Sequence, residues 1–305
     1  MKVLVTGISG FVGARLAPRL LADGHEVRGL VRGPAPVFPE IEFVTGDAVS
    51  GAGLDAALEG VEVAYYLIHS MEPSVAGAFS ERERVAAENF ARAVQRAGVR
   101  RIVYLGGLVP SGRRVSAHLA SRIAVERILL NATSDSVAFR ASIVIGARSR
   151  SFRFLVRLVE RMPVLIVPGW RSHRTAPIDE RDVIAFLAAA ADGERLSGRS
   201  LDLAGPDVVT YGELIERIRD AMLVARPVVG IPRLTLTPIA SRISAVIAGE
   251  AHELIGPLMD GLESDLLPRD SQAAERLLDV RRHSLDAAIE RALRDWELIE
   301  PLRAR

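Results

Sequence analysis

The chain begins with a short apolar run that leads directly into three glycines spaced three residues apart. Residues 2–6 form the run, and Gly7, Gly10 and Gly13 follow it. A dinucleotide-binding turn needs glycine at these places for three reasons: a tight reversal, close approach of the backbone to a diphosphate, and packing of the next helix on the strand. Apolar residues at helical spacing follow the third glycine, as such a turn requires. The sequence therefore predicts a dinucleotide site here, and the alternative is an ordinary glycine-rich turn.

The composition excludes several classes of protein. The 305 residues are 49% hydrophobic, which is enough for a large buried core, and the net charge of +1 gives no sign of a nucleic-acid partner. No cysteine is present and the histidines are scattered, so we expect neither disulfides nor a metal site. The first strand is expected at residue 2 and no apolar run reaches about 20 residues, so we expect no signal peptide, no transmembrane segment and a cytoplasmic location.

Strand and helix signals alternate through the first half of the chain. This order predicts an α/β fold, a doubly wound parallel sheet with helices on both faces. After the first unit, we expect helices at 81–97 and 118–130, and strands at 25–31, 41–45, 61–68, 101–105 and 137–141. Beyond about residue 147, prolines interrupt the pattern. We therefore expect a dinucleotide-binding domain over residues 1–146, and a mainly helical C-terminal lobe over residues 147–305 that returns to the sheet near residues 201–204.

The end of the second strand indicates which nicotinamide cofactor fits. The side chain there, about 20 residues after the glycines, meets the adenosine ribose. Here it is Arg32 rather than an acid, and a guanidinium pairs with the 2′-phosphate of NADP, so NADP is favoured over NAD. A solvated surface arginine is the alternative. Gly46 and Asp47 follow the third strand, where the amide and carboxylate of Asp47 either reach the adenine edge or only form the turn.

These motifs together resemble a known superfamily over the whole chain. They are the glycine turn from Thr6 to Gly13, the pair Gly46 and Asp47, Asn89 on the helix expected at 81–97, and Arg140 on the sixth strand. The set is similar to the extended and atypical short-chain dehydrogenase/reductase superfamily. More narrowly, residues 64–71 and 103–108 resemble its NmrA-like branch, which also resembles the nucleotide-binding accessory subunit of respiratory complex I.

The resemblance implies a set of cofactor-binding residues and a catalytic triad. The expected cofactor-binding residues are Thr6, Gly7, Ser9, Gly10, Phe11, Val12, Gly13, Arg32, Gly46, Asp47, Leu67, Ile68 and Gly106. The family also has a serine after the fifth strand, and a tyrosine four residues before a lysine on the next helix. This chain departs at all three places, because Gly106 stands in the serine region, His118 replaces the tyrosine and Arg122 replaces the lysine.

Two interpretations of that helix remain open. Residues four apart share a helical face, so His118 could donate the proton while Arg122 holds the ribose hydroxyls. Alternatively, the catalytic machinery is lost and both are polar residues beside a bound nucleotide. The second interpretation is favoured by an arginine that does not lose its proton and by the missing serine hydroxyl. His69 and Ser70 follow the fourth strand, where they would lie near the substrate or serve only the structure.

The second half of the chain offers weaker signals. Residues 170–179 place cations and a tryptophan in a loop that would either bind an anionic or aromatic ligand or be solvated. Asp182 matches the acid that opens the corresponding helix of the similar family, and helix capping would explain it without a catalytic role; the helix is expected to begin near Glu180. The leading hypothesis is an NADPH-dependent reductase of a small carbonyl, enone or quinone. The alternative is a non-catalytic NADP(H)-sensing regulator or assembly protein, with a protein partner or homo-oligomer in place of a small-molecule substrate.

Overall fold

The centre of the molecule is a seven-stranded parallel sheet. In this computed structural model of the chain, the described residues are 1–35, 38–68, 78–110, 117–162, 164–167, 169–230 and 264–302. The strands of the sheet are β1 (Lys2–Thr6), β2 (Glu26–Val31), β3 (Glu42–Thr45), β4 (Val63–Tyr66), β5 (Arg101–Gly107), β6 (Val137–Ala141) and β11 (Arg199–Leu203). They lie in the order β11-β6-β5-β4-β1-β2-β3, with parallel neighbours throughout. The chain order reverses between β1 and β4, and ligands of such sheets bind at the carboxyl ends of the strands where this happens.

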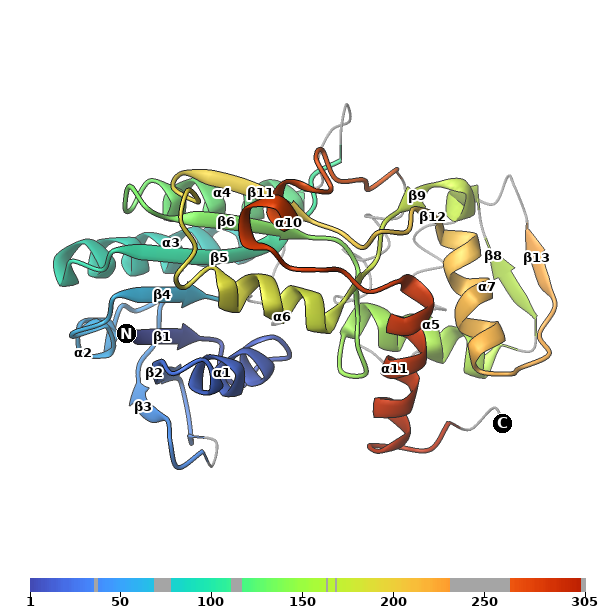
Figure 1. Cartoon of the computed structure of the whole chain (residues 1–305), viewed down its shortest axis with the longest axis horizontal. Helices are drawn as coiled ribbons and strands as arrows, with labels where there is room; N and C mark the ends of the chain where they lie inside the picture. Colours follow the sequence, from blue (N-terminus) through green and yellow to red (C-terminus); the bar gives the residue numbers. More distant parts are fainter. Residues whose placement is uncertain are drawn as a thin grey trace.

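Helices cover both faces of the sheet (Figure 1). One face carries α1 (Gly13–Ala22), α6 (Glu180–Ala189) and α10 (Ala273–Leu278), and the other carries α2 (Leu54–Leu58), α3 (Ala78–Ala97) and α4 (Ala117–Leu130). Successive side chains of a strand point to opposite faces, so Val103 packs with the first group and Tyr104 with the second. The predicted doubly wound parallel sheet is confirmed.

The strands and helices expected in the first half of the chain are present, with shifts at their ends. β4 is shorter than the expected strand at 61–68, and α3 begins at Ala78 rather than at residue 81. The sequence pattern missed α2, because its five residues are too few to show a helical period. From the second half, β11 joins the edge of the sheet, where Leu203 pairs with Ala141.

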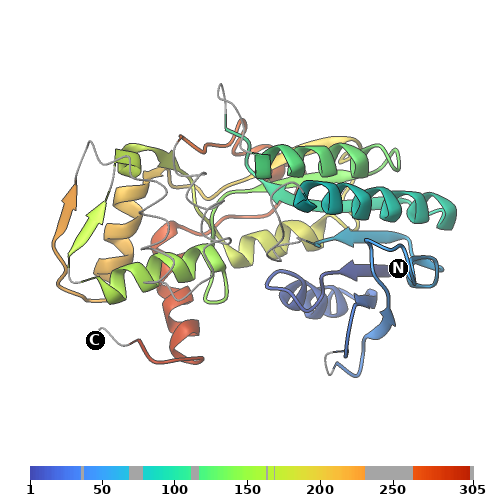
Figure 2. The same cartoon turned by 180° about the vertical axis from the view of Figure 1, so that it is seen from behind.

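A second group of helices lies beside the sheet rather than on it (Figures 1 and 2). It contains α5 (Arg150–Arg161), α7 (Tyr211–Ala221) and α11 (Leu285–Glu297). Their apolar faces share one core, in which Phe152, Leu214 and Trp296 are fully buried. The smaller elements nearby are β7 (Val144–Ile145), β8 (Leu165–Val167), the 3₁₀ helix η1 (Gly169–Ser172), β9 (Arg174–Thr175), β10 (Ile178–Asp179), β12 (Val209–Thr210) and β13 (Val228–Gly230).

None of the helices in the described part of the chain is both long and apolar enough to cross a membrane. The longest of these, α3, is amphipathic: Phe90 and Val94 are buried, whereas Glu81 and Arg92 are exposed. Within the same residues, no group of three or more His, Cys, Asp or Glu side chains could hold a metal ion.

Candidate functional site

The glycine turn predicted from the sequence lies between β1 and α1, at the carboxyl edge of the sheet. Gly7 has a φ of +64°, which favours glycine, and a Cβ there would lie 2.7 Å from the Leu67 carbonyl oxygen. A Cβ on Gly13 would lie 2.3 Å from the Gly7 carbonyl oxygen. The Gly10 amide donates to the same Gly7 carbonyl at 2.9 Å and closes the turn. No side chain fits at Gly7 or Gly13 unless the backbone moves.

Thr6 holds the end of β1 against β4. Its hydroxyl donates to the Tyr65 carbonyl and accepts from the Leu67 amide, both at 3.0 Å, and the residue is fully buried. These bonds bring Leu67, and Ile68 after it, beside the glycine turn. The ends of β1 and β4 therefore lie side by side, and several of the expected cofactor-binding residues line this edge of the sheet.

The first turn of α1 offers backbone donors without a cap. The first amides of a helix have no partner within the helix, and Val12 at the N-cap position supplies no side-chain hydrogen bond. Ser9 and Gly10 are exposed beside it, and Phe11 is half-buried. An uncapped helix N-terminus next to glycines that admit a close approach suits the diphosphate of a dinucleotide. The residues at this edge therefore fit the expected cofactor.

The adenosine end of the expected site contains Arg32 and Asp47. Arg32 directly follows β2 and is exposed. The Asp47 amide donates to the Ala52 carbonyl at 2.9 Å, and its Oδ1 accepts from the Val49 amide at 2.6 Å. Asn89 of α3 supports this turn by donating to two of its carbonyls. Asp47 therefore forms the turn, and its contact with the adenine edge stays a prediction.

At the carboxyl end of β5, a tyrosine lies beneath the expected serine position. Gly106 is partly exposed, and a Cβ there would lie 3.0 Å from Cε1 and 3.3 Å from Oη of Tyr104. Tyr104 is only 2% exposed, and the Arg122 side chain of α4 lies close enough to its hydroxyl to lower its pKa. Burial raises the pKa of Tyr104 to about 12, and the positive charge of Arg122 opposes that rise. The sequence patterns do not single out Tyr104 as a site residue, because its proximity to Arg122 depends on how α4 packs on the sheet.

The residue one turn after Arg122 ties α4 to the sheet. Glu126 is buried and accepts from Nε and Nη2 of Arg140 on β6, at 2.8 and 2.7 Å. It also accepts from the Ser200 hydroxyl of β11 at 2.6 Å. A bidentate arginine pair fixes orientation as well as distance. These bonds therefore hold this part of α4 against β6 and β11.

Three residues proposed for chemistry lie wholly or partly outside the described structure. His69 and Ser70 both fall outside the described residues. His118 is the second residue of α4, and its side chain also lies outside the described part of the chain. Their roles near the substrate stay predictions.

The expectation that Asp182 caps α6 is wrong. The helix begins at Glu180 as predicted, and its N-cap is Asp179, whose carboxylate accepts from the Arg181 amide at 2.7 Å. A cap precedes the first helical residue, so Asp182 lies too far along the helix. Asp182 instead accepts from the His283 amide at 2.8 Å, and its Oδ1 lies 2.5 Å from Nδ1 of that histidine. It thereby anchors the segment that leads into α11.

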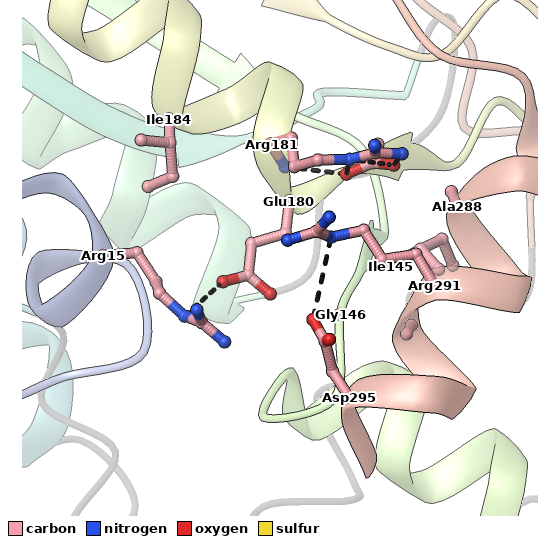
Figure 3. Close-up of a pocket in the computed structure, with 11 residues that line it drawn as sticks. Arg15, Ile145, Gly146, Glu180, Arg181, Ile184, Ala288, Arg291 and Asp295 are labelled. Atoms are coloured by element: carbon pink, nitrogen blue, oxygen red, sulfur yellow. Dashed lines mark hydrogen bonds and ion pairs between the residues drawn. The ribbon is translucent and has the colours of Figure 1, made fainter. Parts of the chain in front are cut away.

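A pocket of about 150 Å³ lies at the junction of α1, α6 and α11 (Figure 3). Arg15, two residues after the last glycine of the turn, lines it, with Nε 3.0 Å from Oε1 of Glu180. Burial raises the pKa of Glu180, and Arg15 opposes the rise. From α11, Arg291 and Asp295 face the same space. Because the charges are paired, the pocket has no excess of one sign that would select an ion.

The loop with cations and a tryptophan makes contacts of its own. The ring of Trp170 meets that of Tyr211 edge to face, with centroids 6.2 Å apart, beside the core of the second helical group. Arg174 donates to the Asp265 carboxylate, with Nη2 and Oδ2 2.7 Å apart. No ligand is needed to explain these positions, and the ligand-binding alternative stays a prediction.

A chain of buried hydroxyls links the sheet to the second helical group. Ser142, the residue after β6, has its Oγ 3.3 Å from Oγ1 of Thr175. The Thr175 hydroxyl in turn lies near that of Tyr211, at the start of α7, and lowers its pKa. All three residues are buried. Sequence reasoning missed this chain, because its members come from three segments that only the fold brings together.

Comparison with known proteins agrees with the geometry of the glycine turn. Residues 7–129 match the protein family described as NAD(P)H-binding. This match and the homologues confirm the resemblance in the motifs: the chain carries an NAD(P)H-binding domain and has homologues in the atypical short-chain dehydrogenase/reductase, NmrA-like family.

Three relatives illustrate the range of similar proteins. The chain is 28% identical to a ceramide reductase of Caulobacter vibrioides, over 93% of each chain. It is 37% identical to a 3 beta-hydroxysteroid dehydrogenase/Delta 5-->4-isomerase of Mycobacterium tuberculosis, over 62% of this chain and 60% of that one. It is 25% identical to the mitochondrial NADH dehydrogenase (ubiquinone) 1 alpha subcomplex subunit 9 of Arabidopsis thaliana, over 92% of this chain and 74% of that one.

A solved structure shares the fold over nearly the whole chain. The UDP-glucuronic acid 4-epimerase of Bacillus cereus, in complex with NAD, has a TM-score of 0.74 at 16% identity. The alignment covers 99% of this chain and 100% of the epimerase. At this identity the likeness shows the fold, and the choice between NAD and NADP depends on residues of this chain.

Proposed function

We propose that this chain is an NADPH-dependent reductase of a small carbonyl compound, an enone or a quinone. The observation that carries the proposal is the glycine turn, where Gly7 and Gly13 leave no room for side chains beside the uncapped N-terminus of α1. The family match to an NAD(P)H-binding domain supports the nucleotide. The relative described as a ceramide reductase, similar over 93% of both chains, supports reduction as the class of reaction.

The cofactor would be held mainly by backbone groups and one cation. The amides near Gly10 and Val12 would bind the diphosphate, while Leu67, Ile68 and Gly106 would line the path of the nicotinamide half. Arg32 would pair with the 2′-phosphate, which favours NADPH over NADH. When bound, NADPH supplies a hydride. The protein must then orient the carbonyl group, exclude water and supply a proton to the carbonyl oxygen.

From the sequence, His118 is a candidate for the proton donor, with His69 and Ser70 near the substrate. Histidine titrates near neutral pH, so it can give and regain a proton under ordinary conditions. If it acts in this way, His118→Phe abolishes NADPH turnover and leaves cofactor affinity almost unchanged. Turnover that survives in this variant excludes the role.

The first test is calorimetric titration of the nucleotide-free protein with NADPH, NADP⁺ and NADH. We expect tight binding of NADPH and weak binding of NADH. Oxidation of NADPH is then followed by absorbance with 4-nitrobenzaldehyde, cyclohex-2-enone and menadione as substrates. Folded protein that binds none of the three nucleotides overturns the proposal, and binding without turnover of any substrate overturns its catalytic part.

A non-catalytic NADP(H) sensor or assembly protein is the second candidate. It is favoured by Gly106 at the serine position and by the relative described as an NADH dehydrogenase subunit. A sensor must bind NADP⁺ and NADPH with different affinities, because a ligand pair shifts states only through differential binding. Equal affinities exclude sensing. Co-elution of a second protein during gel filtration of native extract supports an assembly role.

A further inference from the structure

The carboxyl end of β5 holds a tyrosine hydroxyl that packing alone does not require. The Tyr104 ring packs near that of Tyr66, with centroids 6.2 Å apart, and a phenylalanine would make the same apolar contact. A buried tyrosine hydroxyl needs a hydrogen-bond partner, and Tyr65 meets that need by donating to the Leu187 carbonyl at 3.0 Å. The Tyr104 hydroxyl instead lies near a cation, Arg122 of α4, which lowers its pKa.

This hydroxyl lies beside the position where the related enzymes have the serine of their catalytic triad. Gly106 stands where the related enzymes have a serine, and it is partly exposed. The place of its missing Cβ is 3.3 Å from Oη of Tyr104. A carbonyl oxygen bound over Gly106 would therefore come within hydrogen-bond reach of Tyr104. A tyrosine and a cation meet here as in the family triad, but the tyrosine comes from β5 rather than from the helix.

The charged groups around Tyr104 act on its pKa in opposite directions. Two carboxylates face it, Glu83 of α3 and Glu126 of α4, and both raise its pKa together with burial. Each carboxylate has a partner of its own, as in the 2.8 Å bond from the Ser121 hydroxyl to Glu83. Arg122 is the positive group that lowers the pKa of Tyr104 and stabilises a phenolate there.

We propose that Tyr104 is the proton donor of the reduction, with Arg122 as the positioning residue that holds its hydroxyl. The inference rests on the proposed reductase function and assigns to Tyr104 the role for which His118 is the sequence candidate. During reduction, a hydride adds to the carbonyl carbon, the C=O π bond breaks, and the oxygen takes the Tyr104 proton; NADPH is thereby oxidised to NADP⁺. The phenolate that remains is stabilised by Arg122 and takes a proton from water.

The test uses a carbonyl probe that reports its hydrogen bond without turnover. The absorption of 4-dimethylaminocinnamaldehyde moves to longer wavelength when its carbonyl oxygen accepts a strong hydrogen bond. The probe is added to the full chain saturated with NADP⁺, as wild type, Tyr104→Phe, Arg122→Gln and Arg122→Lys. Tyr65→Phe is the matched control, because it removes another buried tyrosine hydroxyl, one bonded to a backbone carbonyl on the opposite face of the sheet.

We expect the red shift in wild type and in Tyr65→Phe, and none in Tyr104→Phe. Arg122→Gln should reduce the shift and Arg122→Lys should restore most of it. In NADPH turnover, Tyr104→Phe should lower kcat by about 10²- to 10⁴-fold. Arg122→Gln should lower kcat with unchanged NADPH affinity, whereas an arginine that holds the ribose would weaken NADPH binding when removed.

The contrary outcomes separate this inference from the function on which it rests. A red shift and a kcat that persist in Tyr104→Phe overturn the role of Tyr104 and leave the reductase function standing. A red shift lost in His118→Phe and kept in Tyr104→Phe returns the role to His118. No shift in folded, NADP⁺-bound wild type, together with no turnover, overturns the carbonyl reductase and this inference with it.

Discussion

The glycine turn after β1 and the tyrosine–arginine pair at the end of β5 lie at one edge of the same sheet, yet they are built differently. At the turn, the closest approaches involve backbone atoms, as where the Cβ position of Gly13 lies 2.3 Å from the Gly7 carbonyl oxygen. At β5, the contact joins side chains of two elements, Tyr104 on the strand and Arg122 on α4. The turn depends on residue types within a few positions, and the pair depends on how a helix docks on the sheet.

This difference separates nucleotide binding from chemistry. A backbone cradle admits almost no substitution, because any Cβ at Gly7 or Gly13 meets backbone. A proton donor has more freedom, since any neighbouring element that places a hydroxyl in the same volume can supply it. The departures at residues 106, 118 and 122 therefore do not by themselves make the chain inactive. The four predictions below test the two regions and the contacts around them.

The largest effect is expected at Gly13. Gly13→Ala places a methyl group 2.3 Å from the Gly7 carbonyl oxygen and 2.7 Å from the Ile8 Cα, so the turn or α1 must shift. We expect a loss of about 3 kcal/mol in the free energy of unfolding and no measurable NADPH binding. Gly33→Ala is the stability control, because a Cβ there meets nothing within 4 Å. Urea unfolding measures both stabilities. Equal values for the two variants would show that the backbone packing at Gly13 does not exclude a side chain.

The same contrast explains what could be predicted from the sequence. The glycine turn, the succession of strands along the chain and the position of Arg32 after the second strand follow from local patterns, and the structure has the turn and the strands close to where they were expected. Glycine spacing and apolar periodicity act over a few residues, so they are visible in the chain itself. The family resemblance rested largely on the same local motifs.

The contacts that the sequence did not reveal join distant segments. Strand alternation places Tyr104 on the α3 and α4 face, but it does not show that the ring reaches under Gly106 or meets Arg122. Asp182 was expected to act locally as a cap, whereas its partner is His283, which lies in another part of the chain. Such pairings depend on how the loops and helices pack, so periodic patterns in the sequence do not predict them.

The second prediction concerns this long-range contact of Asp182. Asp182→Ala leaves the His283 amide without its acceptor and removes the carboxylate 2.5 Å from the imidazole Nδ1. Because Asp182 is buried, we expect a cost of about 2 kcal/mol. Asp286→Ala is the control, since it removes an exposed ion pair with Arg217 and should cost less than about 1 kcal/mol. Thermal unfolding measures both, and equal costs would contradict the anchoring role of Asp182.

The third prediction concerns Arg32 in the nucleotide-binding region. Arg32 is exposed at the end of β2, so the proposed pairing with a 2′-phosphate would be screened by water and worth about 1.4 kcal/mol. Arg32→Ala should therefore weaken NADPH binding by about tenfold and leave NADH binding unchanged. Arg19→Ala, another exposed arginine of the same half, is the control. Calorimetry that shows equal losses for NADPH and NADH would remove Arg32 as the phosphate partner.

The smallest effect is expected where α1 meets α6. Burial raises the pKa of Glu180 above its ordinary value of 4.5, and Arg15 opposes the rise. A carboxyl whose pKa is raised by folding holds its proton more tightly in the folded state, so its contribution to stability is present below the unfolded pKa and is lost as the pH rises through the folded pKa. The free energy of unfolding of wild type, relative to Glu180→Gln, should therefore fall above pH 4.5, by less than about 1 kcal/mol.

A second variant tests the part played by Arg15 in that pH dependence. Arg15→Gln removes the positive charge 3.0 Å from Glu180, so the pKa of Glu180 should rise further and the loss of stability should extend to higher pH. Urea unfolding at several pH values measures the three proteins under one set of conditions. Curves for wild type and Glu180→Gln that run parallel would show that folding does not shift the pKa of Glu180. The pocket beside the glycine turn would then owe its shape to the packing of α1, α6 and α11, with no cost from a buried charge.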